Sequence, residues 1–208
     1  MRSGTENQIT LVVIRHGETK ANREHRYLGK TEEGLSMEGI EKLQQNKLSA
    51  KYPKVDMLFA SPMKRCRETG AILYPDIHPH FISDWKEMDF GDFEGKNYEE
   101  LKTDHRYQEW IDSGGTLPFP GGESRETFIS RCEAGLREMA GQILKNWESN
   151  HDDSKTAGLI VHGGTIMALL SRFAGGEYFE YQVPNGEGYV CSLTYGEGEL
   201  QLKDIRRL

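Results

Sequence analysis

Two histidines occupy the same kind of position in this chain of 208 residues. Arg15 and His16 follow the apolar run at 11–14, and His162 follows the apolar run at 157–161; a glycine comes after each histidine. Such short apolar runs are typical of strands buried on both faces of a parallel sheet. Open α/β sheets bind ligands at the carboxyl ends of their strands. The pattern therefore predicts that both imidazoles lie at one rim of the sheet.

A third strand end adds a second arginine. In segment 55–73 an apolar strand runs into Ser61-Pro62, a strong helix start, since serine accepts from free amides and proline tolerates the first helical position. Arg65 then lies in the first turn, where free amides attract anions. Arginine matches phosphate with a planar fork of donors. A cationic phosphoryl site is predicted from four residues: Arg15, His16, Arg65 and His162. The alternative is that the rim histidines only cap helices.

An acidic and aromatic loop follows, and it is a source of proton donors. Glu87, Asp89, Asp92 and Glu94 all lie in it, and the residues alone do not select one of them. Acidic loops are usually solvated, so for any single carboxylate a surface role is the more common outcome.

Helical patterns separate the strands. Ser36 is predicted to cap a helix that turns Ile40, Leu43 and Leu48 inward and stops before Pro53, and a further helix is expected over 97–111. In the longest pattern, apolar residues recur every three or four positions: Phe128, Cys132, Leu136, Met139, Ile143 and Trp147.

The order of these elements indicates the fold class. Alternating strands and helices predict an α/β three-layer sandwich, with a mainly parallel sheet and helices on both faces. Apolar and polar residues alternate on both sides of the Gly-Glu-Gly at 196–198, which predicts a C-terminal β-hairpin. The length fits one domain over 1–208.

Composition excludes several classes of partner. The formal net charge of -7 argues against nucleic acid, because nucleic-acid binding needs clustered excess lysine and arginine. The start of the chain has no signal-peptide core and no apolar run approaches a membrane span, so we expect a cytoplasmic protein without a membrane partner. The three cysteines suggest neither a disulfide framework nor zinc. His78 and His80 lack the further ligands of a metal site.

The quoted motifs resemble the histidine phosphatase superfamily, the phosphoglycerate-mutase-like enzymes. The similarity spans nearly the whole chain, in family order: RHGETKAN (15–22), NREHRYLG (22–29), SPMKRCRET (61–69), WKEMDFGDFEG (85–95), PGGES (120–124) and LIVHGGT (159–165).

The resemblance implies a fold of the phosphoglycerate-mutase type and a metal-independent phosphomonoesterase without a cofactor. It implies that His16 becomes a phosphohistidine and that Glu87 is the proton donor. Arg15, Arg65 and His162 would hold the phosphoryl oxygens. Five further residues in the matched segments are expected at the substrate: Thr19, Asn22, Arg26, Gly29 and Gly163.

Three functions are compatible with these motifs. A phosphatase acting on a small phosphorylated metabolite is favoured, because no Arg-Arg pair for a second anionic group lies between Glu87 and His162, as cofactor-dependent phosphoglycerate mutases would have. The mutase is the alternative, and a catalytically silent protein that binds a phospho-ligand is the third. Among phosphatases the chain looks most like the group that acts on α-ribazole 5′-phosphate.

Two segments bear on specificity. Where many members have Gly-x-x-Asp-x-Pro-Leu, this chain has Gly29 to Leu35 with Gly34 in place of the proline, so we expect a freer entrance loop. Four residues are either a lid over the pocket or packing beneath a long loop: Tyr107, Trp110, Pro118 and Phe119.

Overall fold

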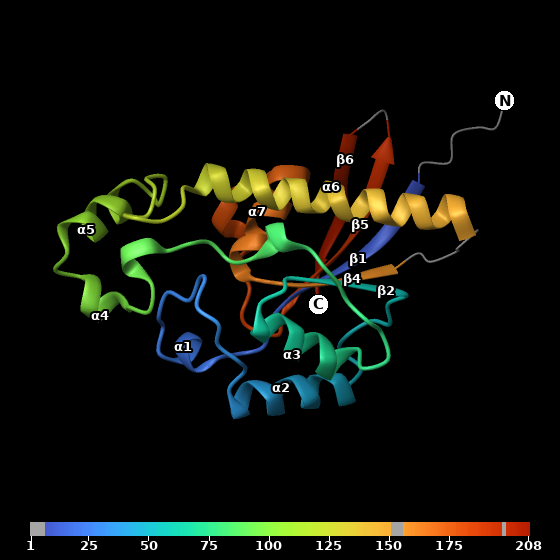
Figure 1. The fold of residues 1–208 in the computed structure, drawn as a ribbon, viewed down its shortest axis with the longest axis horizontal. Helices are drawn as coiled ribbons and strands as arrows, with labels where there is room; N and C mark the ends of the chain where they lie inside the picture. The colour runs from blue at the N-terminus through green and yellow to red at the C-terminus, as the bar shows by residue number, and fades with distance from the viewer. Residues whose placement is uncertain (1–6, 151–155, 197–198) are drawn as a thin grey trace.

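A computed structural model describes residues 7–150, 156–196 and 199–208, and its elements alternate as the sequence predicts (Figure 1). The strands are β1 (Asn7–Arg15), β2 (Met57–Ala60), β3 (His80–Phe81), β4 (Thr156–Val161), β5 (Gly188–Gly196) and β6 (Glu199–Arg207). The helices are α1 (Lys20–Arg23), α2 (Met37–Leu48), α3 (Lys64–Leu73), α4 (Tyr98–Leu101), α5 (His105–Asp112), α6 (Arg125–Asn150) and α7 (Gly163–Ala174). Short 3-10 turns are η1 (Ser83–Trp85), η2 (Gly91–Phe93) and η3 (Tyr178–Tyr181).

The strands form one six-stranded sheet in the order β3-β2-β4-β1-β5-β6. The pairs β1–β4, β2–β4 and β2–β3 are parallel, whereas β1–β5 and β5–β6 are antiparallel. The mainly parallel sheet and the C-terminal hairpin are therefore confirmed, although hairpin residues 197–198 lie outside the described residues. Because β4 lies between β1 and β2, the carboxyl ends of three strands are neighbours.

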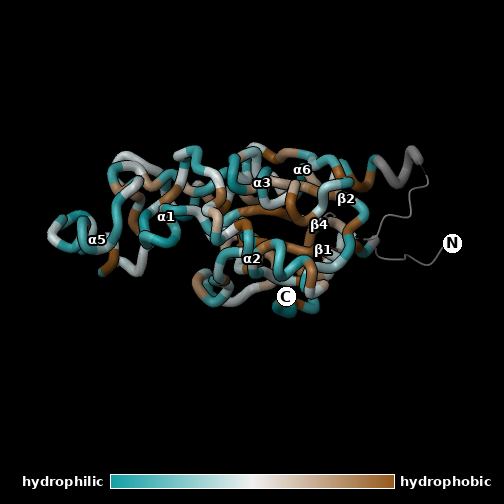
Figure 2. The backbone as a smooth tube through the Cα atoms, turned by 90° about the horizontal axis from the view of Figure 1, so that it is seen from below, coloured by the Kyte–Doolittle hydropathy of each residue, from teal (hydrophilic) through white to brown (hydrophobic). Residues whose placement is uncertain are grey.

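Two apolar cores cover opposite faces of the sheet, which confirms the three-layer sandwich. On one face Val12 and Ile14 of β1 pack with residues of α2 and α3. On the other face Leu11 and Val13 pack with α6 and α7. Figure 1 shows α6 and α7 on one side of the sheet and α2 and α3 on the other, and Figure 2 shows the apolar character of β1 and β4. The alternation of side chains along a strand produces both cores from one run of residues.

The longest helix is α6, and its predicted apolar stripe is confirmed where the structure describes its side chains. Five stripe residues are buried: Phe128, Cys132, Leu136, Met139 and Ile143. The side chain of Trp147 lies outside the described part. Among the described residues no helix combines the length and the apolar character that a membrane span requires.

Helix α2 confirms one prediction and corrects another. The Ser36 side chain accepts from the Gly39 amide, as a helix cap should. Leu43 is buried, but Leu48 is 87% exposed, so the prediction that it faces inward is wrong. Five residues separate Leu43 from Leu48, which rotates the second side chain by about 140° around the helix axis and away from the core.

Two helix boundaries also differ from the prediction. The segment expected as one helix is two, α4 and α5, because Asp104 adopts an extended backbone and its side chain caps α5 by accepting from the Arg106 amide. Helix α3 begins at Lys64, two residues after Pro62, and its N-cap residue is Met63. Ser61 therefore does not cap this helix, and its hydroxyl has another partner.

Candidate active site

Three strand ends bring the predicted cationic residues together. Strands β1 and β4 pair in parallel with Arg15 opposite Val161, so the residues that follow them, His16 and His162, are neighbours. Their ring centroids lie 5.2 Å apart with an interplanar angle of 67°. Arg65, near the start of α3, is completely buried and its Nε donates to His162 Nδ1 at 3.2 Å. The prediction that both imidazoles meet at one rim of the sheet is confirmed.

The orientation of the His16 ring leaves one nitrogen free to react. Nδ1 lies 2.7 Å from the Gly17 carbonyl oxygen, and because a carbonyl only accepts, Nδ1 carries the proton. The lone pair is therefore on Nε2. Burial, reinforced by the charges of Arg65 and Arg15, holds the pKa of His16 well below its usual range. His16 is neutral at physiological pH, which is the state that a nitrogen nucleophile needs.

The second ring, His162, is fixed by hydrogen bonds on both sides. Its Nδ1 accepts from Arg65, so Nε2 carries the proton and donates to the Ser61 hydroxyl at 2.8 Å. Burial and the nearby Arg65 charge also hold its pKa well below the usual range. The sequence assigned Ser61 to a helix cap, whereas the structure makes it the partner of His162. The parallel pairing of β2 with β4, with Ala60 opposite Ile160, brings them together.

Arg15 lines a cavity of about 620 Å³ at this rim. Its Nη1 donates to the Val183 carbonyl at 2.7 Å, and within the described chain its buried Nε has no hydrogen-bond partner. A buried donor left without a partner costs about 1 to 3 kcal/mol, and a ligand oxygen would supply the missing acceptor. A Cβ on Gly163 would lie 3.4 Å from this Nε. Glycine at 163 therefore keeps the space beside Arg15 open.

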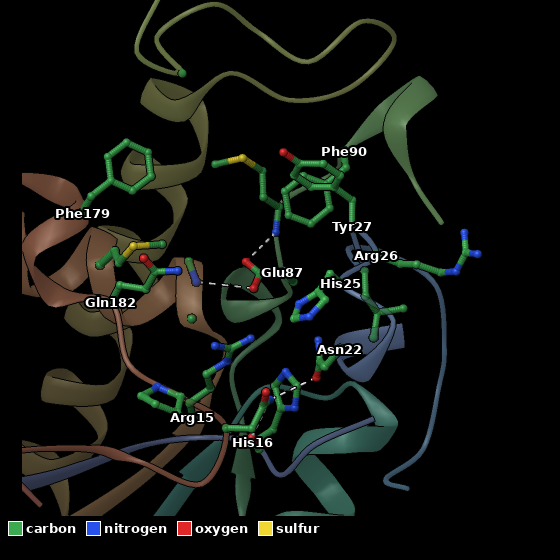
Figure 3. A pocket seen from close by; sticks show the side chains of 18 of the residues that line it. Arg15, His16, Asn22, His25, Arg26, Tyr27, Glu87, Phe90, Phe179 and Gln182 are labelled. Atoms are coloured by element: carbon green, nitrogen blue, oxygen red, sulfur yellow. Dashed lines mark hydrogen bonds between the residues drawn. The ribbon is translucent and has the colours of Figure 1, made fainter. Parts of the chain in front are cut away.

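Glu87 also lines this cavity, and its carboxyl group points into it (Figure 3). Its oxygens accept from the Met88 amide at 3.0 Å and from the Gly164 amide at 3.4 Å. Burial raises the pKa of Glu87, and these amides together with Arg65 and Arg15 oppose that rise. A Cβ on Gly164 would lie 2.4 Å from Oε1, so glycine is needed there for the close approach. Of the four acids in the loop, only Glu87 lines the cavity.

Asn22 is held so that its amide nitrogen is left for a ligand. Its Oδ1 accepts from the Thr19 amide at 3.3 Å and from Asn185 Nδ2 at 3.0 Å. Asn185 also donates to the carbonyl oxygens of His16 and Gly17, and so connects the loop that carries His16 with α1. Thr19 is the completely buried cap of α1, so it supports Asn22 from below.

Two of the predicted substrate residues turn to other groups. The Arg26 guanidinium donates to Glu24 and Glu100, and Figure 3 shows its side chain directed away from His16. The Gly29 carbonyl accepts from Arg65 Nη2 at 2.8 Å, which makes this glycine a support of the buried arginine. Neither arrangement directs a donor at the His16 ring.

The outer part of the cavity is aromatic. The residues that line it include Tyr27, Phe90, Trp110, Phe119 and Phe179. Trp110 and Phe119 have ring centroids 4.8 Å apart, and Phe119 is only 5% exposed. These two residues thus pack into the core and line the cavity at once.

The other two residues for which a lid and loop packing were the alternatives do not line the cavity. Tyr107 is buried in the core, and Pro118 is exposed. In the described residues no group of three or more histidine, cysteine, aspartate or glutamate side chains is arranged to hold a metal ion.

Comparison with known proteins identifies the family. The family model described as "Histidine phosphatase superfamily (branch 1)" matches residues 11–207. The chain belongs to this superfamily. The "Uncharacterized phosphatase PhoE" of Bacillus subtilis is 27% identical over 194 residues, covering 92% of this chain and 91% of that protein. The "Adenosylcobalamin/alpha-ribazole phosphatase" of Escherichia coli is 25% identical over 171 residues, covering 80% of each chain.

Solved structures confirm the fold of this histidine phosphatase superfamily member. The crystal structure of the alpha-ribazole phosphatase from Shigella flexneri aligns with a TM-score of 0.75 at 23% identity, covering 94% of this chain and 95% of that one. Relatives of similar identity carry phosphatase names and phosphoglycerate mutase names. Identity alone therefore does not separate these two activities within the superfamily.

The entrance loop of this family member is held by carboxylates where the usual proline is missing. Glu32 accepts from the Lys64 amide at 2.8 Å, Glu33 from the Ala21 amide at 3.2 Å and Glu68 from the Leu35 amide at 2.7 Å. We expected the loop to be freer without proline, and these hydrogen bonds offset that loss. Glu32, which stands where many members have aspartate, thus helps to hold the loop.

Asn185 and Arg131 are residues of the site that the sequence did not reveal. Asn185 follows β4 and α7 in the chain and lies beside the loop that carries His16 only because β5 pairs with β1. Arg131 of α6 donates to the carbonyl oxygens of Lys86 and Glu87 and pairs with Glu123 at 2.8 Å. Nothing in the sequence distinguishes Arg131 from the other charged residues of α6, such as Arg137.

Proposed function

We propose that this chain is a metal-independent phosphomonoesterase that transfers the phosphoryl group of a small metabolite through His16. The observation that supports it most is the His16 ring, with its proton on Nδ1 and its lone pair on Nε2, next to Arg15 and His162. A neutral imidazole in a cationic site is suited to attack a phosphorus atom whose oxygens are negatively charged.

The proposed reaction has two displacements. In the first, His16 Nε2 forms a bond to phosphorus while the ester oxygen leaves and takes the proton of Glu87. In the second, a water molecule gives its proton to Glu87 and its oxygen attacks phosphorus. The bond to Nε2 then breaks, which releases phosphate and restores neutral His16 and protonated Glu87. The raised pKa of Glu87 supports its part, because the first step needs a protonated carboxyl group.

In this proposal Arg15 and Asn22 donate to the non-bridging oxygens from the cavity wall, beside the first turn of α7. Arg65 and His162 would join them by exchanging their present hydrogen bonds for bonds to the phosphoryl group. Thr19 and Gly29 support the site from behind, and Gly163 leaves the room that the phosphoryl group needs.

The substrate we propose is a small phosphomonoester, and α-ribazole 5′-phosphate is a member of that class. The name of the Escherichia coli relative supports this choice, as does an aromatic cavity wall able to pack against a planar ring. A cytoplasmic location agrees with such a metabolite.

The decisive experiment is hydrolysis of p-nitrophenyl phosphate with excess EDTA and with vanadate. We expect turnover that survives EDTA, is inhibited by vanadate and is lost in His16→Ala. His78→Ala, an exposed histidine that does not line the cavity, is the matched control and should retain full activity. A need for added Mg²⁺ or Zn²⁺ would overturn the mechanism.

The other two functions are outcomes of the same series. Interconversion of phosphoglycerates faster than phosphate release, in a coupled assay with catalytic 2,3-bisphosphoglycerate, would identify a mutase. Vanadate binding without turnover of any phosphomonoester would identify a silent binding protein.

A further inference from the structure

His25 occupies a backbone position that helices usually give to glycine. Its φ of +53° is left-handed, and it comes two residues after the end of α1. The His25 amide donates to the Asn22 carbonyl at 3.0 Å and the Arg26 amide to the Ala21 carbonyl at 2.9 Å. These two bonds define a Schellman motif, in which glycine is common because it has no Cβ to strain. A histidine here is therefore not explained by the requirements of the helix end.

The side chain of His25 lies in the proposed reaction cavity. It is one of the residues that line the cavity, and Figure 3 shows its ring directed toward the space between Glu87 and Asn22. The residue is exposed, and in the described part of the chain its ring has no hydrogen-bond partner. Both ring nitrogens are thus free to meet a ligand.

The neighbours of His25 show which part of a substrate would meet it. The phosphoryl group is placed by Arg15 and His16, and the ester oxygen has to lie within reach of Glu87. The aromatic wall of Tyr27 and Phe90 begins beyond that point. The His25 imidazole is thus a polar group at the boundary between the reacting atoms and an apolar wall.

We propose that His25 is a specificity-determining residue that hydrogen-bonds a hydroxyl group on the carbon atoms next to the ester oxygen. This inference rests on the proposed function. It assigns the substrate to phosphorylated polyols or sugars, whose further part packs against the aromatic wall. An imidazole both donates and accepts, so it suits a hydroxyl group, which does the same.

The test compares two substrates that differ only in hydroxyl groups, glycerol 3-phosphate and propyl phosphate. We expect the wild-type protein to have a higher kcat/KM for glycerol 3-phosphate. In His25→Gly the ratio of the two values should fall about 3- to 10-fold, the size of one hydrogen bond. His25→Asn, which tolerates the left-handed backbone and keeps a donor and an acceptor, should recover part of that ratio.

The chain supplies a matched control in Ala50, which has a φ of +56°. The end of α2 has the same two hydrogen bonds: the Ala50 amide donates to the Lys47 carbonyl, and the Lys51 amide donates to the Asn46 carbonyl. Ala50 does not line the cavity. Ala50→Gly makes the same backbone change at a distance. Both glycine variants should melt at or above the wild-type temperature, and only His25→Gly should change the substrate ratio.

The outcomes separate this inference from the proposed function. A wild-type ratio near one, or an unchanged ratio in His25→Gly, overturns the role of His25 while the phosphatase activity stands. An equal change of ratio in Ala50→Gly also overturns it, because the effect would then come from the backbone. Absence of phosphatase activity in the wild-type protein overturns both.

Discussion

Glu87 is the residue whose protonation state most directly affects the first step of the proposed reaction. A protonated carboxyl group matters most when the leaving alcohol is a poor leaving group. We therefore predict that Glu87→Gln lowers kcat by about 10²- to 10⁴-fold for propyl phosphate, the usual range for general acid catalysis. The loss should be smaller for p-nitrophenyl phosphate, because nitrophenolate leaves without a proton. Steady-state kinetics on both substrates measure the difference, and equal small losses would reject this role.

The pH dependence of the same variant gives a second readout. Burial raises the pKa of Glu87, so the wild-type carboxyl group keeps its proton to higher pH than an ordinary glutamate. As pH rises through that raised pKa the proton is lost, and kcat for propyl phosphate should decline. Glutamine does not titrate, so Glu87→Gln should lack this decline. An identical alkaline decline in both proteins would assign it to another group.

Individual residues of the site were predictable where one pattern fixed their place. Arg15, His16 and His162 follow apolar strands directly, so the end of each strand determines which rim they reach. Ser61 was predicted as a helix cap, because its contact with His162 depends on the pairing of β2 with β4, which the local sequence does not specify. Arg26 was expected at the substrate and lines the cavity, but nothing in the sequence indicates that its guanidinium pairs with Glu24 and Glu100.

At the scale of elements, Arg131 of α6 fixes the loop that carries Glu87. Its guanidinium makes five hydrogen bonds, two to Glu123 and one each to the carbonyls of Asp84, Lys86 and Glu87. Because a lysine ammonium is a compact point charge without the planar fork, Arg131→Lys cannot reproduce this set. We predict a loss of about 2 to 4 kcal/mol in the free energy of unfolding, from several charged hydrogen bonds.

The same variant should also lower kcat roughly 10- to 100-fold through displacement of Glu87, since a small misplacement of a catalytic group has such effects. A positioning role requires that the loss be larger for propyl phosphate than for p-nitrophenyl phosphate. Arg137→Lys is the control, because Arg137 lies on the same helix, is half exposed and pairs with Glu133 at the surface. Equal effects of the two variants would contradict the special place of Arg131.

The elements themselves could be predicted, but not all of their ends. Strand and helix periods are properties of the local sequence, which is why β1, β4 and α6 agree with the prediction. The break between α4 and α5 arises because Asp104 adopts the extended backbone of a helix cap and not a helical conformation. Local propensity does not decide that choice, because the packing of Tyr107 into the core favours the second helix in its observed direction.

For the whole molecule, the order of strands is what makes the site. Because β4 lies between β1 and β2, the carboxyl ends of these three strands are neighbours. The sequence predicts where each strand ends, but it does not predict the order of the strands in the sheet. The chain has a net charge of -7, yet this rim gathers Arg15, Arg65 and two buried imidazoles. The fold therefore concentrates cationic groups at one rim of an acidic protein. Burial and the charge of Arg65 lower the pKa of both histidines, so the two imidazoles are neutral.

That neutrality makes stability depend on pH. Burial holds the pKa of His16 and of His162 well below the 6.5 of an unfolded chain, so between these values the unfolded chain binds more protons. The free energy of unfolding is therefore highest above about pH 6.5 and falls as pH decreases toward the folded pKa values. Each histidine contributes a slope of up to about 1.4 kcal/mol per pH unit.

Urea denaturation between pH 5 and 8, in buffers free of phosphate, measures this slope. His162→Asn removes one titrating group, so its curve should be flatter by up to about 1.4 kcal/mol per pH unit below pH 6.5. His105→Asn changes an exposed histidine, with 82% of its side chain accessible, and should leave the slope as it is. If His162→Asn keeps the full slope, the charged imidazole is tolerated in the folded site. Burial and the neighbouring Arg65 would then not be what holds the His162 ring neutral.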